Sequence, residues 1–249
     1  MTTAAVSLSG VGVVYGAHPA LDAVDLDVAP GQRVALVGPS GAGKTTVLNL
    51  CTGTVAPTSG SVSVLGCDVG RATAAELQAL RRRVGTVYQQ LHLVGPLRVV
   101  HNVNAGRLGS WSTWQALRSL LRPLDVDSAR QALTEVGIAD KLQERTDRLS
   151  GGEQQRVALA RVLVQQPELI LADEPVASLD PARADEVMDL LGAAAADHGR
   201  ALLVSLHDFD LARRRCDRVV GLRAGRVVFD LPAADVTADV GTELYRIGT

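Results

Sequence analysis

The sequence predicts an α/β fold in which a core with a parallel sheet is joined to an N-terminal antiparallel β subdomain and an inserted helical subdomain. Three observations support this prediction. Two Val-rich segments lie near the N-terminus, several short apolar runs are bounded by polar residues, and the middle third has helical periodicity without a convincing strand. The 249 residues suffice for one large domain or two small lobes.

The N-terminal segments are expected to form the antiparallel subdomain. Segments 4–15 and 20–29 alternate in part, and Ala17-His-Pro separates them, which predicts two antiparallel strands. Arg33–Val37 is a short apolar run that leads into a glycine-rich turn, and Lys44–Cys51 follows as a helix. The order is therefore strand, loop and helix.

Two later runs, 169–172 and Ala201–Leu206, are short and apolar, as buried parallel strands are. A helix is expected between them, with Asp180 as its N-cap and Pro181 at its first position. It carries one apolar stripe at helical spacing: Val187, Leu190, Leu191 and Ala194. Strand, helix and strand of these lengths predict a parallel sheet with helices on its faces.

The middle of the chain, about 97–165, is expected to be helical, and 217–230 resembles a hairpin. We therefore expect a single nucleotide-binding unit over 1–249. Its approximate parts are a core with the β subdomain, 1–90 and 166–249, and a helical subdomain, 91–165.

The composition is typical of a globular protein, with 47% hydrophobic and 21% charged residues. The formal net charge is −2, so no basic excess exists to neutralise nucleic-acid phosphates, and no nucleic-acid partner is expected. Cys51, Cys67 and Cys216 are odd in number and far apart, which favours a reducing compartment without disulfides or zinc. No signal peptide or membrane helix is recognised, so the sequence predicts a cytosolic chain, with docking on a membrane protein left open.

The strongest motif is a complete G-x-x-x-x-G-K-[ST] sequence, with a strand expected before it and a helix after it. Its glycines let backbone N–H groups surround phosphates, and the helix N-terminus adds a positive dipole. Lys44 can reach the β- and γ-phosphates, and the Thr45 hydroxyl can bind Mg²⁺. An ordinary glycine turn is the alternative. The predicted nucleotide-binding residues are Gly38, Pro39, Ser40, Gly41, Ala42, Gly43, Lys44, Thr45 and Thr46.

Two acidic residues follow the apolar run 169–172, at the strand end where parallel sheets bind ligands. Asp173 is expected to hold Mg²⁺, directly or through water, and Glu174 to polarise the attacking water. An acidic pair after a strand is by itself more often a helix cap, but the phosphate-binding loop favours the metal and catalytic roles.

A third motif, Leu-Ser-Gly-Gly-Glu-Gln-Gln-Arg, occupies 149–156. Ser150 and Glu153 form a capping-box pattern that predicts the start of a helix. Gly151 and Gly152 leave N–H groups of its first turn uncovered, which suits an anion. A well-capped surface helix is the alternative.

These motifs occur, together with Gln89, 178–180 and His207, in the order found in the nucleotide-binding subunit of ATP-binding-cassette (ABC) transporters. The chain resembles that family over nearly its whole length. The resemblance implies that ATP and Mg²⁺ are the cofactors and that Tyr15 stacks on adenine. It also implies that Gln89 senses Mg²⁺ and the attacking water, and that His207 contacts the γ-phosphate. His207 follows Ala201–Leu206, so it is expected at the sheet edge that carries Asp173.

The resemblance further implies a dimer in which two copies of the chain enclose two ATP molecules head to tail. Ser178-Leu179-Asp180 would cross the dimer interface, with Asp180 at the nucleotide. Four residues of one chain would close on the ATP held by the other: Ser150, Gly151, Gly152 and Gln154.

A closer resemblance is to the phosphonate-import ATPases, carried by 88–95, 102–109, 111–121 and 172–180. Departures from the Phe-containing pattern of that group occur at Tyr88, Leu91 and His92. The resemblance implies an ATP hydrolase that powers import of phosphonates or related phosphorus oxyanions by ATP-driven dimer closure. It further implies two transmembrane permease subunits, an extracytoplasmic solute-binding protein as an indirect partner, and a peripheral position at the cytoplasmic face of the cell membrane.

Other features suggest no ligand. Trp111 and Trp114 fit the lobe core or permease contacts better than a cofactor site, and the clusters 81–83 and 213–215 fit solvated helix faces.

Three alternatives were weighed. An amino-acid importer or a lipoprotein or peptide exporter would share the ATPase chemistry. A soluble ABC protein of DNA repair or translation would need a long coiled coil or a second cassette, and a P-loop kinase or GTPase would lack the motif at 149–156.

Overall fold

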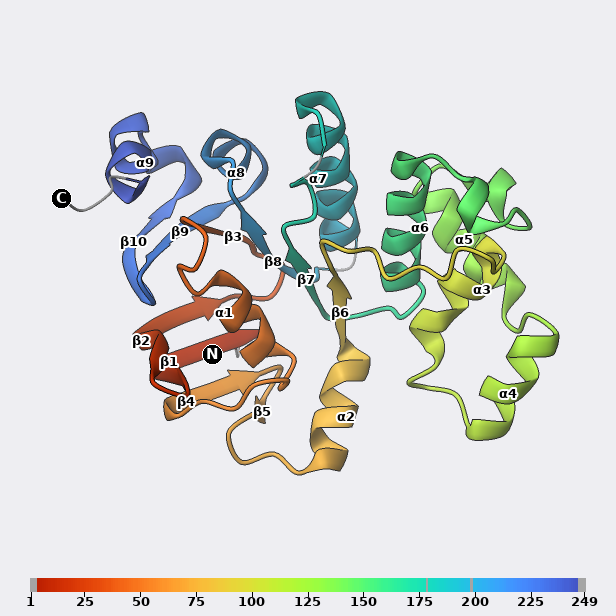
Figure 1. Ribbon diagram of the computed structural model, residues 1–249, viewed down its shortest axis with the longest axis horizontal. Coiled ribbons are helices and arrows are strands. Elements are labelled where there is room, and N and C mark those ends of the chain that lie inside the picture. Colours follow the sequence, from red (N-terminus) through yellow and green to blue (C-terminus); the bar gives the residue numbers. More distant parts are fainter. Residues whose placement is uncertain (1–3, 178, 198, 246–249) are drawn as a thin grey trace.

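The computed structural model describes residues 4–177, 179–197 and 199–245 and contains two sheets. The smaller sheet is antiparallel and has the order β2-β1-β4-β5. It lies at the lower left of Figure 1, beside α1. Its strands are β1 (Val6–Tyr15), β2 (His18–Val28), β4 (Ser59–Val64) and β5 (Cys67–Asp68). The expected first turn is shorter than the sequence suggested, because Gly16 takes a left-handed conformation and β2 already begins at His18.

The larger sheet has the order β10-β9-β3-β8-β7-β6. Its strands are β3 (Arg33–Val37), β6 (Val84–Val87), β7 (Leu169–Asp173), β8 (Ala201–Leu206), β9 (Arg218–Arg223) and β10 (Arg226–Pro232). Neighbouring strands pair in parallel except at β9 and β10, which form an antiparallel hairpin at one edge. The predicted fold class, including the parallel sheet and the antiparallel β subdomain, is confirmed.

The core has two parts, one on each face of the larger sheet. Along β3, Val34 and Leu36 pack toward the β subdomain and α1, whereas Ala35 and Val37 pack on the side of α6 and α7. This alternation follows from the two-residue period of a strand. Because both faces are covered, every residue of β8 is buried.

Helices cover both faces and form one end of the molecule, where α3, α4, α5 and α6 gather (Figure 1). The helices are α1 (Lys44–Cys51), α2 (Ala74–Arg83), α3 (Val99–Asn104), α4 (Thr113–Leu121), α5 (Val126–Glu135), α6 (Gly151–Leu163), α7 (Pro181–Ala196), α8 (Phe209–Arg215) and α9 (Ala238–Tyr245). The described residues also include four short 3₁₀ turns: Ala105–Arg107, Ala139–Lys141, Thr146–Arg148 and Ala233–Asp235. Among the described residues, no helix combines the length and apolar character needed to cross a membrane.

The hairpin expected at 217–230 is present, and its tip packs against the glycine-rich loop. Ala224 and Gly225 both have positive φ, as a two-residue hairpin turn requires. The Gly225 N–H donates to the Ala42 carbonyl over 3.1 Å. A Cβ at Gly38 would lie 2.1 Å from the Leu222 carbonyl oxygen, so only glycine fits where the loop meets β9.

The arginine clusters end α2 and α8, and several of their members make specific contacts. Arg81 donates to the carbonyls of Thr52 and Gly53, each over 2.9 Å. Arg83 pairs with Glu168 at 2.6 Å, and Arg215 pairs with Asp185 at 2.8 Å. Arg81 is exposed, and Arg83 and Arg215 are partly exposed, so these solvated helix faces also make specific contacts with carbonyls and carboxylates of neighbouring elements.

The three cysteines differ in expected reactivity. Burial raises the pKa of the Cys51 and Cys216 thiols to about 12, so both remain neutral near pH 8, whereas Cys67 is half-buried.

We expect a disulfide reagent such as DTNB to react rapidly with one thiol of the folded protein, that of Cys67, and with all three thiols after unfolding. The Cys67→Ser variant should lose the rapid phase. Rapid labelling that persists in this variant would contradict the burial of the other two.

Candidate nucleotide-binding and hydrolysis site

The parallel register of the larger sheet brings distant segments to one edge. Val37 of β3 lies opposite Leu206 of β8, and Asp173 of β7 lies opposite Ser205 of β8. The loop after β3, the acidic pair after β7 and His207 after β8 therefore lie together at the carboxyl ends of the strands. In open α/β sheets this edge is where ligands bind.

The loop at 38–43 surrounds the side chain of Lys44, which is only 4% exposed. Lys44 Nζ donates to the carbonyls of Gly38 at 2.8 Å and Pro39 at 3.3 Å. Burial lowers the pKa of the Lys44 ammonium group, and the nearby carboxylates of Glu174 and Asp173 oppose this change.

The rest of the loop contains glycines with unusual backbone conformation or open surroundings. Gly43, the N-cap of α1, has φ 106°, a conformation that favours glycine. At Gly41 the space around an added Cβ is open within 4 Å. Ser40 and Thr45 are exposed, whereas Ala42 and Thr46 are buried. The loop thus presents a helix N-terminus and a lysine at one point, which is an arrangement that binds phosphates.

Hydroxyl and carboxylate oxygens meet beside this lysine. Thr45 Oγ1 donates to Asp173 Oδ1 at 3.3 Å, and Ser205 Oγ donates to the same oxygen at 2.7 Å. Hydroxyl and carboxylate oxygens suit Mg²⁺, which prefers oxygen ligands and usually keeps waters and substrate phosphates in its shell. Thr45 and Asp173 therefore fit the metal role that the sequence suggested.

Glu174 connects the acidic pair to both Lys44 and His207. Its Oε1 lies 2.5 Å from His207 Nε2 and 3.8 Å from Lys44 Nζ. Its backbone is in the left-handed region, at φ 47°, which is uncommon for a residue with a side chain. The Glu174 N–H donates to Ser205 Oγ at 2.9 Å, and this hydrogen bond stabilises the turn that directs the carboxylate toward the loop.

Ser205 is a residue that the sequence analysis missed. It is fully buried in β8, where its hydroxyl accepts from the Glu174 backbone and donates to the Asp173 carboxylate. A polar residue inside the apolar run Ala201–Leu206 was the only available signal. The bond it makes depends on cross-strand register, which the sequence does not display.

The residues expected to act on a second nucleotide form a separate group. Ser150 Oγ caps α6 by accepting from the Glu153 N–H at 3.3 Å, and Glu153 Oε2 accepts from the Ser150 N–H at 2.8 Å. Hydrogen bonds from Ser150 lower the pKa of the Glu153 carboxyl. An added Cβ at Gly151 or Gly152 would meet open space within 4 Å, and Gln154 Nε2 donates to the Leu149 carbonyl at 3.1 Å.

The remaining predicted residues are Asp180, Ser178, Gln89 and Tyr15, which lie outside the 150–154 group. Asp180 caps α7 by accepting from the Arg183 N–H at 3.1 Å, and Ser178 lies outside the described residues. Gln89 is exposed, two residues beyond β6. Tyr15 ends β1 with 46% of its surface exposed, so its ring is not part of the core.

Comparison with known proteins identifies the family. Residues 21–177 match the family model described as ABC transporter. The chain belongs to the ABC transporter family. Among the described residues, no hydrogen bond or ion pair links the 150–154 group to the 38–46 loop in one chain of this family member.

Several curated relatives of this ABC protein are named phosphonates import ATP-binding protein PhnC. The relative from Anaeromyxobacter dehalogenans is 52% identical over 97% of this chain, which spans 48% of that protein, about half its length. A relative from Pseudomonas syringae pv. syringae (strain B728a) is 47% identical over 91% of this chain and 85% of that protein. A relative from Pseudomonas aeruginosa (strain UCBPP-PA14) is 48% identical over 96% of this chain and 90% of that protein. The predicted resemblance to phosphonate-import ATPases is confirmed.

Solved structures of ABC cassettes share the fold. A bacterial ABC transporter cassette described as dimeric matches with a TM-score of 0.77 and 30% identity, over 92% of this chain and 98% of that chain. A related structure of that cassette, described as bound to ADP and Pi, matches with a TM-score of 0.73 at the same identity and coverage.

Removing the Ser205 hydroxyl should impair hydrolysis more than folding. We expect Ser205→Ala to lower ATP turnover about 10- to 100-fold, because the hydroxyl positions Asp173 and the Glu174 turn. The free energy of unfolding should fall by about 1–3 kcal/mol. Ser205→Thr, which restores a hydroxyl, should recover activity.

The matched control is Ser119→Ala, which removes a hydrogen bond of a buried serine to the Ala116 carbonyl, away from this edge. It should reduce stability without changing turnover. Equal turnover in Ser205→Ala and the unmodified protein would show that the hydroxyl has no positioning role.

Proposed function

We propose that this chain is the ATP-hydrolysing subunit of an importer for phosphonates or related phosphorus oxyanions, powered by ATP-driven closure of a dimer. The observation that carries the proposal is the grouping of Lys44, Asp173, Glu174 and His207 at one sheet edge. The cargo follows from several relatives named as phosphonate-import proteins, of which this chain covers 85% or more of the length.

The geometry assigns each side chain a role. Lys44 Nζ, held at the mouth of the loop, binds phosphoryl oxygens, and Thr45 with Asp173 holds Mg²⁺. When bound, Mg²⁺ neutralises charge that develops on the phosphates. The Glu174 carboxylate orients the attacking water, because it lies 3.8 Å from the Lys44 ammonium and is still 20% exposed.

The His207 side chain controls access to that carboxylate. Its Nε2 lies 2.5 Å from Glu174 Oε1, so this nitrogen carries the proton of the contact. The same N–H is the donor that we assign to the γ-phosphate. When it turns to the phosphate, the Glu174 carboxylate is free to accept a hydrogen bond from water.

A second copy of the chain completes the site. Ser150 and Gln154 make their described contacts within their own segment, and a Cβ added at Gly151 or Gly152 would meet open space within 4 Å. We assign these groups, together with Asp180, Gln89 and Tyr15, to the nucleotide of the closed dimer. A dimeric state of a 30% identical cassette supports this assembly.

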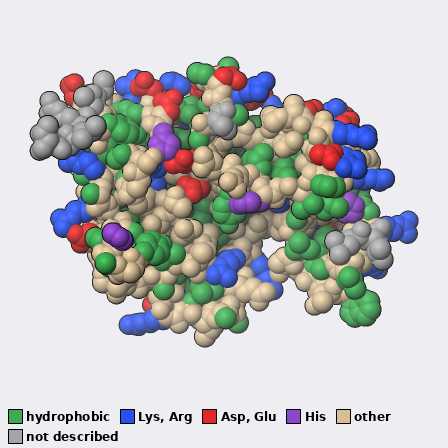
Figure 2. Space-filling model, in the orientation of Figure 1, with side chains coloured by type: hydrophobic (Ala, Val, Ile, Leu, Met, Phe, Trp, Pro, Cys, Tyr) green, Lys and Arg blue, Asp and Glu red, His purple; other side chains and the backbone are tan. Residues whose placement is uncertain are grey.

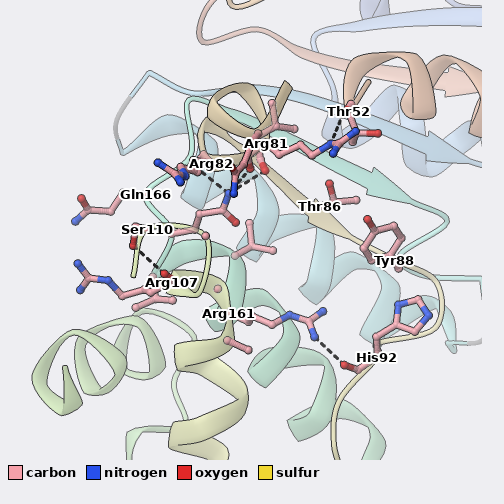
Figure 3. A pocket seen from close by; sticks show the side chains of 18 of the residues that line it. Thr52, Arg81, Arg82, Thr86, Tyr88, His92, Arg107, Ser110, Arg161 and Gln166 are labelled. Atoms are coloured by element: carbon pink, nitrogen blue, oxygen red, sulfur yellow. Dashed lines mark hydrogen bonds between the residues drawn. The ribbon is translucent and has the colours of Figure 1, made fainter. Parts of the chain in front are cut away.

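The groove between β6, the helices α2 and α6 and the 3₁₀ turn Ala105–Arg107 is the surface that we assign to a permease subunit (Figure 3). It has a volume of about 530 Å³ and is lined by Tyr88 and His92 of the segment that contains Gln89. A partner in this groove would therefore contact the segment that reaches the hydrolysis site. With one permease subunit per copy and a solute-binding protein on the outer side, the chain would act as a peripheral subunit at the cytoplasmic face of the membrane.

Cargo is tested by reconstituting the chain with its permease in vesicles. A phosphonate-loaded binding protein should raise ATP turnover, and an amino-acid-loaded binding protein should not. Stimulation by amino acid rather than by phosphonate would replace the cargo assignment while leaving the ATPase assignment intact.

The role of Glu174 is tested separately. Glu174→Gln should lower ATP turnover by about 10²–10⁴-fold, because the amide cannot accept a proton from water.

The two-chain site is tested by mixing variants. Lys44→Ala damages one half of each site, and Ser150→Arg damages the other half by blocking the N-terminus of α6. Glu174→Gln is added to both chains to prevent hydrolysis. Neither homodimer should then occlude ATP. A mixed dimer has one undamaged site and should retain about one ATP. Nucleotide retention is measured on dimers purified with two different tags. No retention in these mixed dimers would refute the role of Ser150 across the interface.

A further inference from the structure

A long stretch of the chain contains arginines but no acidic residue. The whole chain has 27 Asp and Glu residues and a net charge of −2, yet none of the acidic residues lies between Glu76 and Asp125. Seven arginines lie in this stretch: Arg81, Arg82, Arg83, Arg98, Arg107, Arg118 and Arg122. Such separation of charge creates a local positive potential on a chain that is weakly acidic as a whole.

The fold brings this stretch to one side of the molecule. In Figure 1, α2 and α4 both extend toward the lower edge. In Figure 2, the same edge is hollowed, with Lys and Arg side chains at its border and hydrophobic side chains on the lobe to the right. Figure 3 shows Arg81, Arg82 and Arg107 around the groove. A Cβ at Gly109 would lie 3.4 Å from Arg82 Cγ, so the segment before α4 contacts the end of α2.

Helix α4 exposes apolar side chains beside these cations. Ser112 caps it with a capping box to Gln115, so the helix begins at a defined position. Trp114 is 82% exposed and Leu117, one turn later, is 56% exposed. Of the two positions expected for Trp114, the lobe core and a contact surface for the permease, this exposure excludes the lobe core. A large exposed aromatic next to another apolar side chain is typical of an interaction surface.

Several of the arginines are not neutralised within the chain. Arg83 pairs with Glu168, and Arg107 lies 3.4 Å from Asp125. By contrast, over the described part of the chain no ion pair involves Arg82, Arg118 or Arg122. Arg118 and Arg122 are exposed, and Arg118 follows Leu117 directly. The apolar face of α4 is thus flanked by unpaired positive charges.

We propose that α4 and its flanking arginines bind directly to anionic phospholipid headgroups, with Trp114 and Leu117 entering the headgroup layer. A short helix with an apolar face and arginines beside it lies in the plane of a membrane surface, where tryptophan is favoured and cations meet negative lipids. This contact differs from permease binding in the groove, and it requires neither ATP nor a permease. It gives the chain its own affinity for an anionic bilayer.

The test uses the full chain and vesicles without a permease. Trp111→Phe leaves Trp114 as the only tryptophan, so its fluorescence reports the surroundings of α4. Vesicles of phosphatidylcholine with about 30 mol% phosphatidylglycerol are compared with vesicles of phosphatidylcholine alone. We expect co-sedimentation and a blue shift of the emission with the anionic vesicles only, both decreasing as salt increases.

Matched variants locate the contact. Arg118→Gln and Arg122→Gln should each weaken vesicle binding about fivefold. Trp114→Ala should weaken it about tenfold or more. The controls are Arg130→Gln, an exposed arginine of α5 beyond the acid-free stretch, and Val228→Ala, a 44% exposed apolar residue of β10. Both controls should bind as the unmodified chain does.

Each outcome is decisive. Absence of binding to anionic vesicles at low salt overturns the proposal, as does binding that Trp114→Ala and the arginine variants leave unchanged. A blue shift that occurs only with the permease in neutral lipid also overturns it, since a protein would then be the occupant. ATP turnover of every variant is measured in parallel. In the unmodified chain, absence of vesicle binding with normal ATP turnover refutes only this proposal, and vesicle binding without ATP turnover refutes only the proposed function.

Discussion

The parallel pairing of β7 with β8 is the constraint on which the site depends. It places Asp173 opposite Ser205, so that one buried hydroxyl binds the Asp173 carboxylate and supports the Glu174 turn. A shift of the register by one residue would reverse the faces of β8 and remove both contacts. The left-handed backbone of Glu174 is retained because its N–H has this fixed partner. The pairing of β7 with β8 therefore also sets the positions of Asp173 and Glu174 at the site.

A second constraint acts on the phosphate-binding loop. The β9–β10 hairpin contacts this loop at two points. The Leu222 carbonyl lies next to Gly38, and the Gly225 N–H donates to the Ala42 carbonyl. Backbone lies against backbone at these points, so no side chain separates them. The loop is thereby held by the larger sheet on one side and by the β subdomain on the other, where an added Cβ at Gly43 would meet Leu21 at 2.6 Å.

The parts of the site that could be predicted are those with local signals. The phosphate-binding loop, the acidic pair after β7 and the capping box at Ser150 each show their role within a few residues, and parallel topology brings the first two together. Ser205 could not be predicted, because its function depends on the residue opposite it. The start of α2 could not be predicted because this helix buries only Leu80, and β4 could not be predicted because its serines and glycine resemble a loop. The exposure of Trp114 was not predictable either, since periodicity alone does not say which face of a lone helix has a neighbour.

Helix α6 makes defined contacts at both ends, so it connects the Ser150 cap to the segment after β6. Its N-terminus is the Ser150 cap, while Arg161 near its C-terminus donates to the carbonyls of Leu91 and His92 at 2.8 and 2.9 Å. The helix is about 20 Å long and stiff over that length. Residues 91–92 must therefore move together with α6, which leaves the short segment 88–90 to absorb any rotation between them and β6. A rigid-body rotation of α6 at the Ser150 end would therefore also change the backbone beside Gln89.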